Sequence, residues 1–155
     1  MWAIKRALDK VGASTTVVTF ATEGEERLVY SADEKAELSY RSAGVGGGTQ
    51  PSKAINYAKY VLANSNRAIK IFIAITDGEW YGEDNKMSED AIAQLRKGGI
   101  ITALGMIDSQ SLEHGDVTIN GHGCESIALI NDMGQLFTLA KDMVRVGIKR
   151  NLLNN

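Results

Sequence analysis

The pattern of apolar and polar positions predicts a domain in which strands alternate with helices. Its clearest feature is residues 71–75, an unbroken apolar run rich in β-branched side chains. Such a run is typical of a strand in a parallel sheet that helices cover on both faces, so we expect a buried central strand here. The run ends at Thr76, Asp77 and Gly78. A carboxylate therefore follows the strand at the edge of the sheet where open α/β folds bind ligands.

Further strands are expected at residues 15–22, 27–30, 100–107 and 126–130. The acidic stretch between the first two of these segments predicts a hairpin turn, and the last is expected to be an edge strand. Strands that alternate with helices argue for a Rossmann-like, three-layer α/β fold, in which a mostly parallel central sheet is flanked by helices.

Helical spacing of apolar positions predicts helices at residues 1–11, directly after Pro51, at residues 88–97 and at residues 133–148. Pro51 suits the first position of a helix because its missing N–H has no partner there in any case. Ser88 is expected as the N-cap of the third helix, which ends at Gly98 and Gly99.

The length and composition are those of one ordinary globular domain. The 155 residues are expected to form a single domain over 1–150, followed by a polar tail at 151–155. A net charge of -2 and a pI near 5.7 argue against nucleic acid or an anionic membrane as a partner. The single Cys124 and the lack of a secretory leader pattern favour an intracellular, cytoplasmic location, and no apolar run approaches the roughly 20 residues that span a membrane.

Two loops carry the candidate chemistry. The glycine-rich loop that ends in Gly48 and Thr49 leads into a helix, and the loop with Asp77 leaves the next strand. In a doubly wound sheet both loops lie at the same edge, so the Thr49 hydroxyl and the Asp77 carboxylate can converge on one hard cation, which prefers oxygen ligands.

At this order, and with these flanking residues, the two loops resemble those of the von Willebrand factor type A (vWA) domain. The resemblance covers nearly the whole chain and rests on four stretches: Thr-Thr-Val-Val-Thr-Phe-Ala at 15–21, Gly-Gly-Gly-Thr-Gln-Pro-Ser-Lys-Ala-Ile at 46–55, Ile-Phe-Ile-Ala-Ile-Thr-Asp-Gly-Glu at 71–79 and Ile-Ile-Thr-Ala-Leu-Gly-Met-Ile at 100–107. The resemblance implies a metal-ion-dependent adhesion site for Mg²⁺ or Mn²⁺, with Thr49 and Asp77 as metal residues. It also implies binding of a partner protein, whose carboxylate completes the metal site, and no enzymatic activity.

The chain departs from the family pattern in one respect. The family's first strand ends in Asp-x-Ser-x-Ser, which supplies three metal-site residues, and the sequence contains no such motif. The motif is expected upstream of this sequence, unless another chain donates the strand or the site is vestigial. An open gap in the sheet would leave backbone groups of the neighbouring strands unpaired, so a chain without the strand is expected to form a homo- or hetero-oligomer.

Each candidate residue also has a structural interpretation. Thr49 suits a helix N-cap, and Asp77 suits an Asx-turn before Gly78. The partner-binding rim is expected to comprise six residues around the two loops: Gly48, Gln50, Gly78, Glu79, Trp80 and Tyr81. The aromatic members fit a contact surface, but they can equally pack on their own loop.

Other kinds of site are less well supported. The glycine-rich loop lacks the P-loop motif and follows a polar segment rather than a strand, which argues against nucleotide binding. Four potential zinc ligands occur close together in the sequence: His114, Asp116, His122 and Cys124. Their spacing matches no standard zinc site, and it does not indicate a catalytic pair of cysteine and histidine.

We therefore expect a protein-binding module without catalytic activity. One alternative is a structural or assembly protein with a vestigial metal site, whose sheet is completed by another chain. Another is an accessory subunit of an AAA+ ATPase or chelatase, a role that the family resemblance permits.

Overall fold

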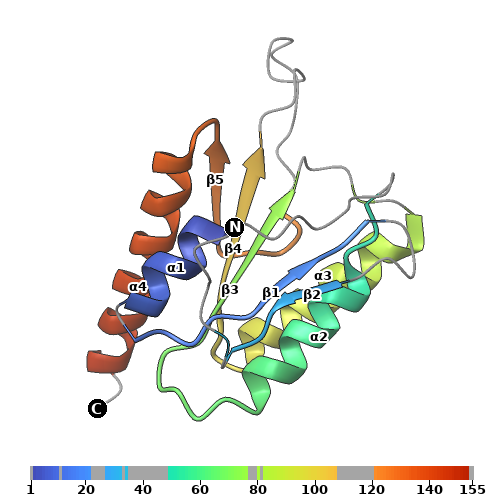
Figure 1. Cartoon of the computed structure of the whole chain (residues 1–155). Coiled ribbons are helices and arrows are strands. Elements are labelled where there is room, and N and C mark those ends of the chain that lie inside the picture. The colour runs from blue at the N-terminus through green and yellow to red at the C-terminus, as the bar shows by residue number, and fades with distance from the viewer. Residues whose placement is uncertain are drawn as a thin grey trace.

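The structure is a computed structural model that describes residues 2–10, 12–21, 27–32, 34, 49–76, 80, 82–107 and 121–153. Helices and strands alternate along most of this part of the chain (Figure 1). In chain order the elements are α1 (Trp2–Lys10), β1 (Val17–Thr19), β2 (Arg27–Tyr30), α2 (Ser52–Ala63), β3 (Ile71–Thr76), α3 (Gly82–Lys97), β4 (Ile101–Ile107), β5 (Ser126–Ile130) and α4 (Met133–Leu153).

The strands form two separate sheets. β3, β4 and β5 form a parallel three-stranded sheet in that order, while β1 and β2 pair antiparallel in a sheet of their own. The antiparallel pairing confirms the expected hairpin partners, although the turn between them lies outside the described residues. Parallel strands joined through helices confirm the predicted α/β fold class.

Helices cover both faces of the three-stranded sheet, with α1 and α4 on one side and α2 and α3 on the other (Figure 1). On the α2 and α3 side the core includes Ile55, Phe72 and Ile92. On the α4 side Leu136 and Leu139 pack on the sheet, and Leu8 of α1 joins the same cluster. α2, α3 and α4 therefore pack apolar side chains against the sheet, whereas α1 also buries the charged Lys5.

The structure corrects the prediction that residues 71–75 form a central strand. Within the described part of the chain, β3 is an edge strand that pairs only with β4. Its side chains alternate between buried and half-buried positions, with Phe72 and Ala74 buried and Ile73 half-buried. A continuous apolar run thus lies at an edge, which its composition alone does not indicate.

Two helix boundaries also differ from the predictions. α3 begins at Gly82, so Ser88 is not its N-cap but a fully buried residue inside it. α4 continues to Leu153, beyond the expected end at residue 148. None of the helices in the described ranges has the length and apolar character needed to cross a membrane.

Candidate functional site

Thr49 and Gln50 directly precede helix α2. The Gln50 backbone N–H donates to the Ala21 carbonyl oxygen at 2.9 Å. This hydrogen bond connects the segment before α2 to the chain just after β1. Pro51 occupies the N-cap position of α2 and provides no side-chain cap. Thr49 is half-buried and lies two residues before that position. The alternative interpretation of Thr49 as the N-cap of this helix is therefore wrong.

Asp84 joins the beginning of α2 to the first turn of α3. Its carboxylate accepts a hydrogen bond from the Ser52 backbone N–H at 3.1 Å and another from the Ser52 hydroxyl. The Ser88 hydroxyl also donates to it, at 3.3 Å. Because α3 follows the loop that leaves β3, this contact holds the segment with Thr49 near the carboxyl end of β3.

Sequence reasoning missed the role of Asp84. The helix was expected to begin at Ser88, whereas Asp84 stands with Glu83 in the first turn of α3. The acidic pair before an apolar helical pattern was the available signal, since carboxylates are favoured in the first turn of a helix.

Trp80 is a core residue in this structure. Its side chain is 8% exposed, and its indole N–H donates to the Thr76 hydroxyl at 3.1 Å. The ring stacks on His122, with 3.8 Å between ring centroids. This placement corresponds to the packing alternative for Trp80 rather than to an exposed partner-binding rim.

His122 extends the contact from Trp80 to α3. The imidazole is 3% exposed, and its Nδ1 lies 2.9 Å from Asn85 Oδ1 and 3.4 Å from Glu89 Oε1. The backbone of His122 has a φ of 45°, a left-handed conformation that is uncommon for residues other than glycine. His122 therefore anchors the chain before β5 onto the end of the sheet that carries Trp80.

Cys124 lacks the properties of a nucleophile or a thiolate ligand. Burial raises the pKa of its thiol from 9.0 to about 12, against a smaller opposing effect of the Arg96 charge. Only a thiolate attacks or binds metal efficiently, so the thiol is inert near neutral pH. No cluster of three or more His, Cys, Asp or Glu side chains suited to a metal occurs in the described ranges, and His114 and Asp116 lie outside them.

One polar atom beside Thr49 in the sequence lacks a hydrogen-bond partner among the described residues. Gln50 Oε1 is buried and has no hydrogen-bond partner in the described structure, so an acceptor beside the Thr49 position is available to a ligand. Hard cations take such amide and hydroxyl oxygens together with carboxylates. The carboxylate expected to join them, Asp77, lies outside the described residues, as do Gly48, Gly78, Glu79 and Tyr81.

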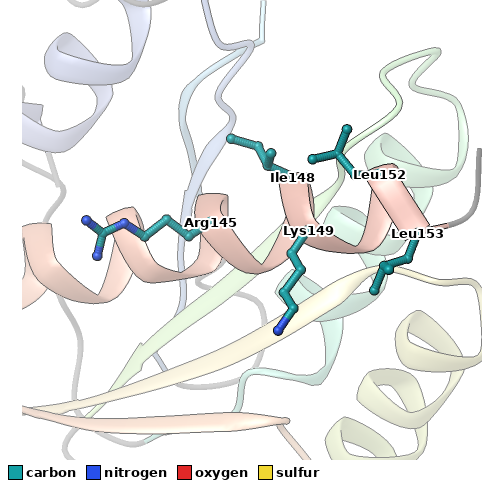
Figure 2. A pocket seen from close by; sticks show the side chains of 5 residues that line it. All are labelled: Arg145, Ile148, Lys149, Leu152 and Leu153. Atoms are coloured by element: carbon teal, nitrogen blue, oxygen red, sulfur yellow. The ribbon is translucent and has the colours of Figure 1, made fainter.

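A surface hollow lies at the C-terminal end of α4, far along the chain from these residues. It is lined by Arg145, Ile148, Lys149, Leu152 and Leu153. Figure 2 shows Ile148 and Leu152 pointing to one side of the helix, and Lys149 and Leu153 to the other. Side chains of one helix that diverge in this way cannot enclose a small ligand, because pockets need groups that converge.

Comparison with known proteins supports the fold. The chain is similar to the crystal structure of the conserved hypothetical protein BatB from Bacteroides thetaiotaomicron, with a TM-score of 0.59 and 17% sequence identity. The match covers 94% of this chain and 85% of the BatB chain. No protein-family model matches the sequence, and no curated protein matches it. The chain thus has a Rossmann-like α/β fold, consistent with the expected vWA-like architecture.

Proposed function

We propose that this chain is a protein-binding module of the vWA type, which recognises its partner at the carboxyl edge of the sheet. The observation that carries the proposal is the contact of Asp84 with Ser52. This contact ties the segment after Thr49 to the helix that follows the Asp77 loop. The helices that follow the two loops are therefore joined at their first turns.

The proposed site uses a divalent cation, Mg²⁺ or Mn²⁺. The Thr49 hydroxyl and the Asp77 carboxylate would hold the ion, and the unpartnered Gln50 Oε1 offers a further oxygen. Because such ions take about six oxygen ligands, water molecules and a carboxylate of the partner protein would complete the shell. The bound ion supplies positive charge that attracts that carboxylate, so the module binds its partner and catalyses nothing.

Calorimetric titration of Mg²⁺ and Mn²⁺ tests the proposal. We expect heat of binding for the wild-type chain, and its loss in Asp77→Ala. Asp90→Ala is the matched control, because Asp90 is an exposed carboxylate on α3 and should leave the binding unchanged. Absence of binding to the wild-type chain, or equal binding to Asp77→Ala, would contradict the metal site.

A further inference from the structure

Basic side chains gather at the end of the domain where the three parallel strands begin. Arg67 precedes β3 and Lys97 precedes β4, and the first residues of these strands, Ile71 and Ile101, are paired in the sheet. The last turns of α4 return to the same end, because this helix starts after the carboxyl end of β5. We call this surface the basic end, and it comprises six residues: Arg67, Lys70, Arg96, Lys97, Lys149 and Arg150.

Contacts between the elements place these residues side by side. The Lys70 carbonyl oxygen accepts a hydrogen bond from the Ile101 N–H at 3.1 Å, so the loop before β3 lies beside the start of β4. Gly147 of α4 packs closely on Ile69 of the same loop. Figure 1 shows this loop and the C-terminal end of α4 at the end of the sheet away from the arrowheads.

The positive charge of the basic end is only partly neutralised within the chain. The Glu125 carboxylate forms ion pairs with Arg96 at 3.6 Å and with Arg150 at 2.5 Å, and the two arginine side chains remain 48% and 47% exposed. The other four basic residues form no ion pair with another described residue. One carboxylate thus serves two arginines, and the surface keeps an excess of positive charge.

The dipoles of the helices account for only part of this charge. Cations are favoured near helix C-termini, which explains Arg96 and Lys97 at the end of α3 and Arg150 near the end of α4. Each terminus carries roughly half a negative charge, so the two helices together offset about one cation. Arg67 and Lys70 lie in the loop beyond α2, whose last turn contains no basic residue. The remaining charge is available to a partner.

Exposed apolar side chains stand beside the basic end. Ile148, Leu152 and Leu153 of α4 are 47%, 74% and 76% exposed, and they line the surface hollow together with Arg145 and Lys149. In Figure 2 Ile148 and Leu152 point to one side of α4, whereas Leu153 points to the other. A membrane surface takes up the single apolar face of a helix, so it would meet only one of these groups. A flexible chain can follow both sides of the helix end.

We propose that the basic end binds a flexible acidic segment of a partner protein, which also carries apolar side chains. Arginine suits such a segment because its guanidinium can donate two parallel hydrogen bonds to one carboxylate. Glu125 provides an example within the chain, since its carboxylate already lies between two arginines of this surface. The basic end lies away from the loops after β3 and β4, so it is distinct from the proposed metal-dependent contact.

Fluorescence anisotropy with synthetic peptides tests the proposal on the whole chain. The probe is a fluorescent peptide that repeats Glu-Asp-Leu, and EDTA in the solution prevents a divalent ion from binding it at Thr49 and Asp77. We expect this peptide to bind, and its affinity to fall as the salt concentration rises, because ions screen exposed charges. A peptide that repeats Gln-Asn-Leu lacks the charges and should bind at least about tenfold more weakly. One that repeats Glu-Asp-Ser lacks the apolar contacts and should bind at least about threefold more weakly.

Two pairs of lysines on the same two helices provide matched variants. Lys97→Ala with Lys149→Ala removes charge from the basic end, whereas Lys86→Ala with Lys141→Ala removes equal charge from earlier parts of α3 and α4. All four lysines are exposed, so neither double variant should change stability by much. We expect the first double variant to bind the Glu-Asp-Leu peptide about three- to thirtyfold more weakly than the second.

NMR spectra of the wild-type chain locate the bound peptide. On addition of the Glu-Asp-Leu peptide, we expect the backbone amides of residues 67–70, 96–97 and 148–153 to shift. These segments are distant in the sequence, so their joint response would show that they form one surface. Shifts confined to the residues around Thr49 and Trp80 would contradict the proposal.

Three other results would overturn it. The first is no binding of the Glu-Asp-Leu peptide, or equal binding of all three peptides. The second is equal binding of the Glu-Asp-Leu peptide to the two double variants. The third is sedimentation of the chain with phosphatidylserine vesicles without binding of the acidic peptide, since an anionic membrane would then be the partner. Because EDTA excludes the metal site from the peptide titrations, failure here leaves the Thr49 and Asp77 proposal to its own test.

Discussion

Replacement of Asp84 by alanine should strongly destabilise the chain. The Asp84 carboxylate accepts hydrogen bonds from the backbone and hydroxyl of Ser52 and from the hydroxyl of Ser88. The two serine side chains are 3% and 0% exposed. Their donors would therefore lose a charged acceptor in a place that water reaches poorly.

The magnitude follows from these contacts. A hydrogen bond to a charged group contributes about 1.5–3 kcal/mol, and an unsatisfied buried group costs about 1–3 kcal/mol. The bonds share one carboxylate, and water can enter the space left by the side chain, so their contributions are not additive. We expect Asp84→Ala to lower the free energy of unfolding by about 3–4 kcal/mol. Asp84→Asn keeps one acceptor oxygen and should lower it by about 1–2 kcal/mol.

Urea unfolding followed by circular dichroism measures these differences. Asp90→Ala removes an exposed carboxylate from the same helix and should change stability by less than about 0.5 kcal/mol. For a chain of this length the loss in Asp84→Ala corresponds to a melting temperature lower by roughly 6–16 °C. A change for Asp84→Ala no larger than that for Asp90→Ala would refute the anchoring role of this carboxylate.

Four further predictions concern the core. Because burial raises the pKa of Cys124 to about 12, iodoacetamide should label the folded thiol at least about a hundredfold more slowly than the urea-unfolded thiol, as measured by mass spectrometry. Because this pKa lies above the value of 9.0 for an unperturbed thiol, the unfolded chain loses the Cys124 proton first, and the free energy of unfolding should fall as pH rises above about 9. Urea denaturation at pH 8 and pH 10 measures this fall, which Cys124→Ala should reduce. A Cβ on Gly147 would lie 2.4 Å from Ile69 Cγ2, so Gly147→Ala should cost about 1–2 kcal/mol in urea unfolding despite its better helix propensity, and a gain in stability would contradict this close packing. Trp80→Phe keeps a ring against His122 but loses the bond to Thr76, and should cost about 1–2 kcal/mol, whereas no loss would show that this bond is unimportant.

Much of the fold was predictable because it depends on local periodicity. The apolar positions of α4 recur at helical spacing, and Leu136, Leu139 and Met143 are indeed buried. The run at residues 100–107 was expected as a buried strand, and residues 101–107 form β4, the middle strand of its sheet. The spacing of apolar residues predicts these elements because it determines which side of a helix or strand faces the core.

Features that depend on tertiary contacts were not predictable in the same way. The run at residues 71–75 looks like a central strand, but its position in the sheet depends on which strands lie beside it. The start of α3 was misplaced because Asp84 gains its role from Ser52, a residue on another helix. Trp80 was equally consistent with an exposed rim and with packing, and only its partner His122 distinguishes the two.

Of the candidate site, the sequence predicts two loops, but not the contact between the helices that follow them. The order of Thr49 and Asp77 around a strand predicts a shared edge from topology alone. The contact of Ser52 with Asp84 joins side chains that are distant in the sequence. The roles of Thr49 and Asp77 in metal binding stay predictions that the titration decides.

At the opposite end of the sheet an acidic residue contacts both helical layers. Glu125, just before β5, forms ion pairs with Arg96 of α3, at 3.6 Å, and with Arg150 of α4, at 2.5 Å. One carboxylate thus bridges the helical layers of both faces, and each arginine lies near the C-terminal end of its helix, where positive charge is favoured. These ion pairs join the two helical layers at the end of the sheet that lies away from the loops after β3 and β4. Evolution can therefore alter those loops to suit new partners while the scaffold beneath them keeps its shape.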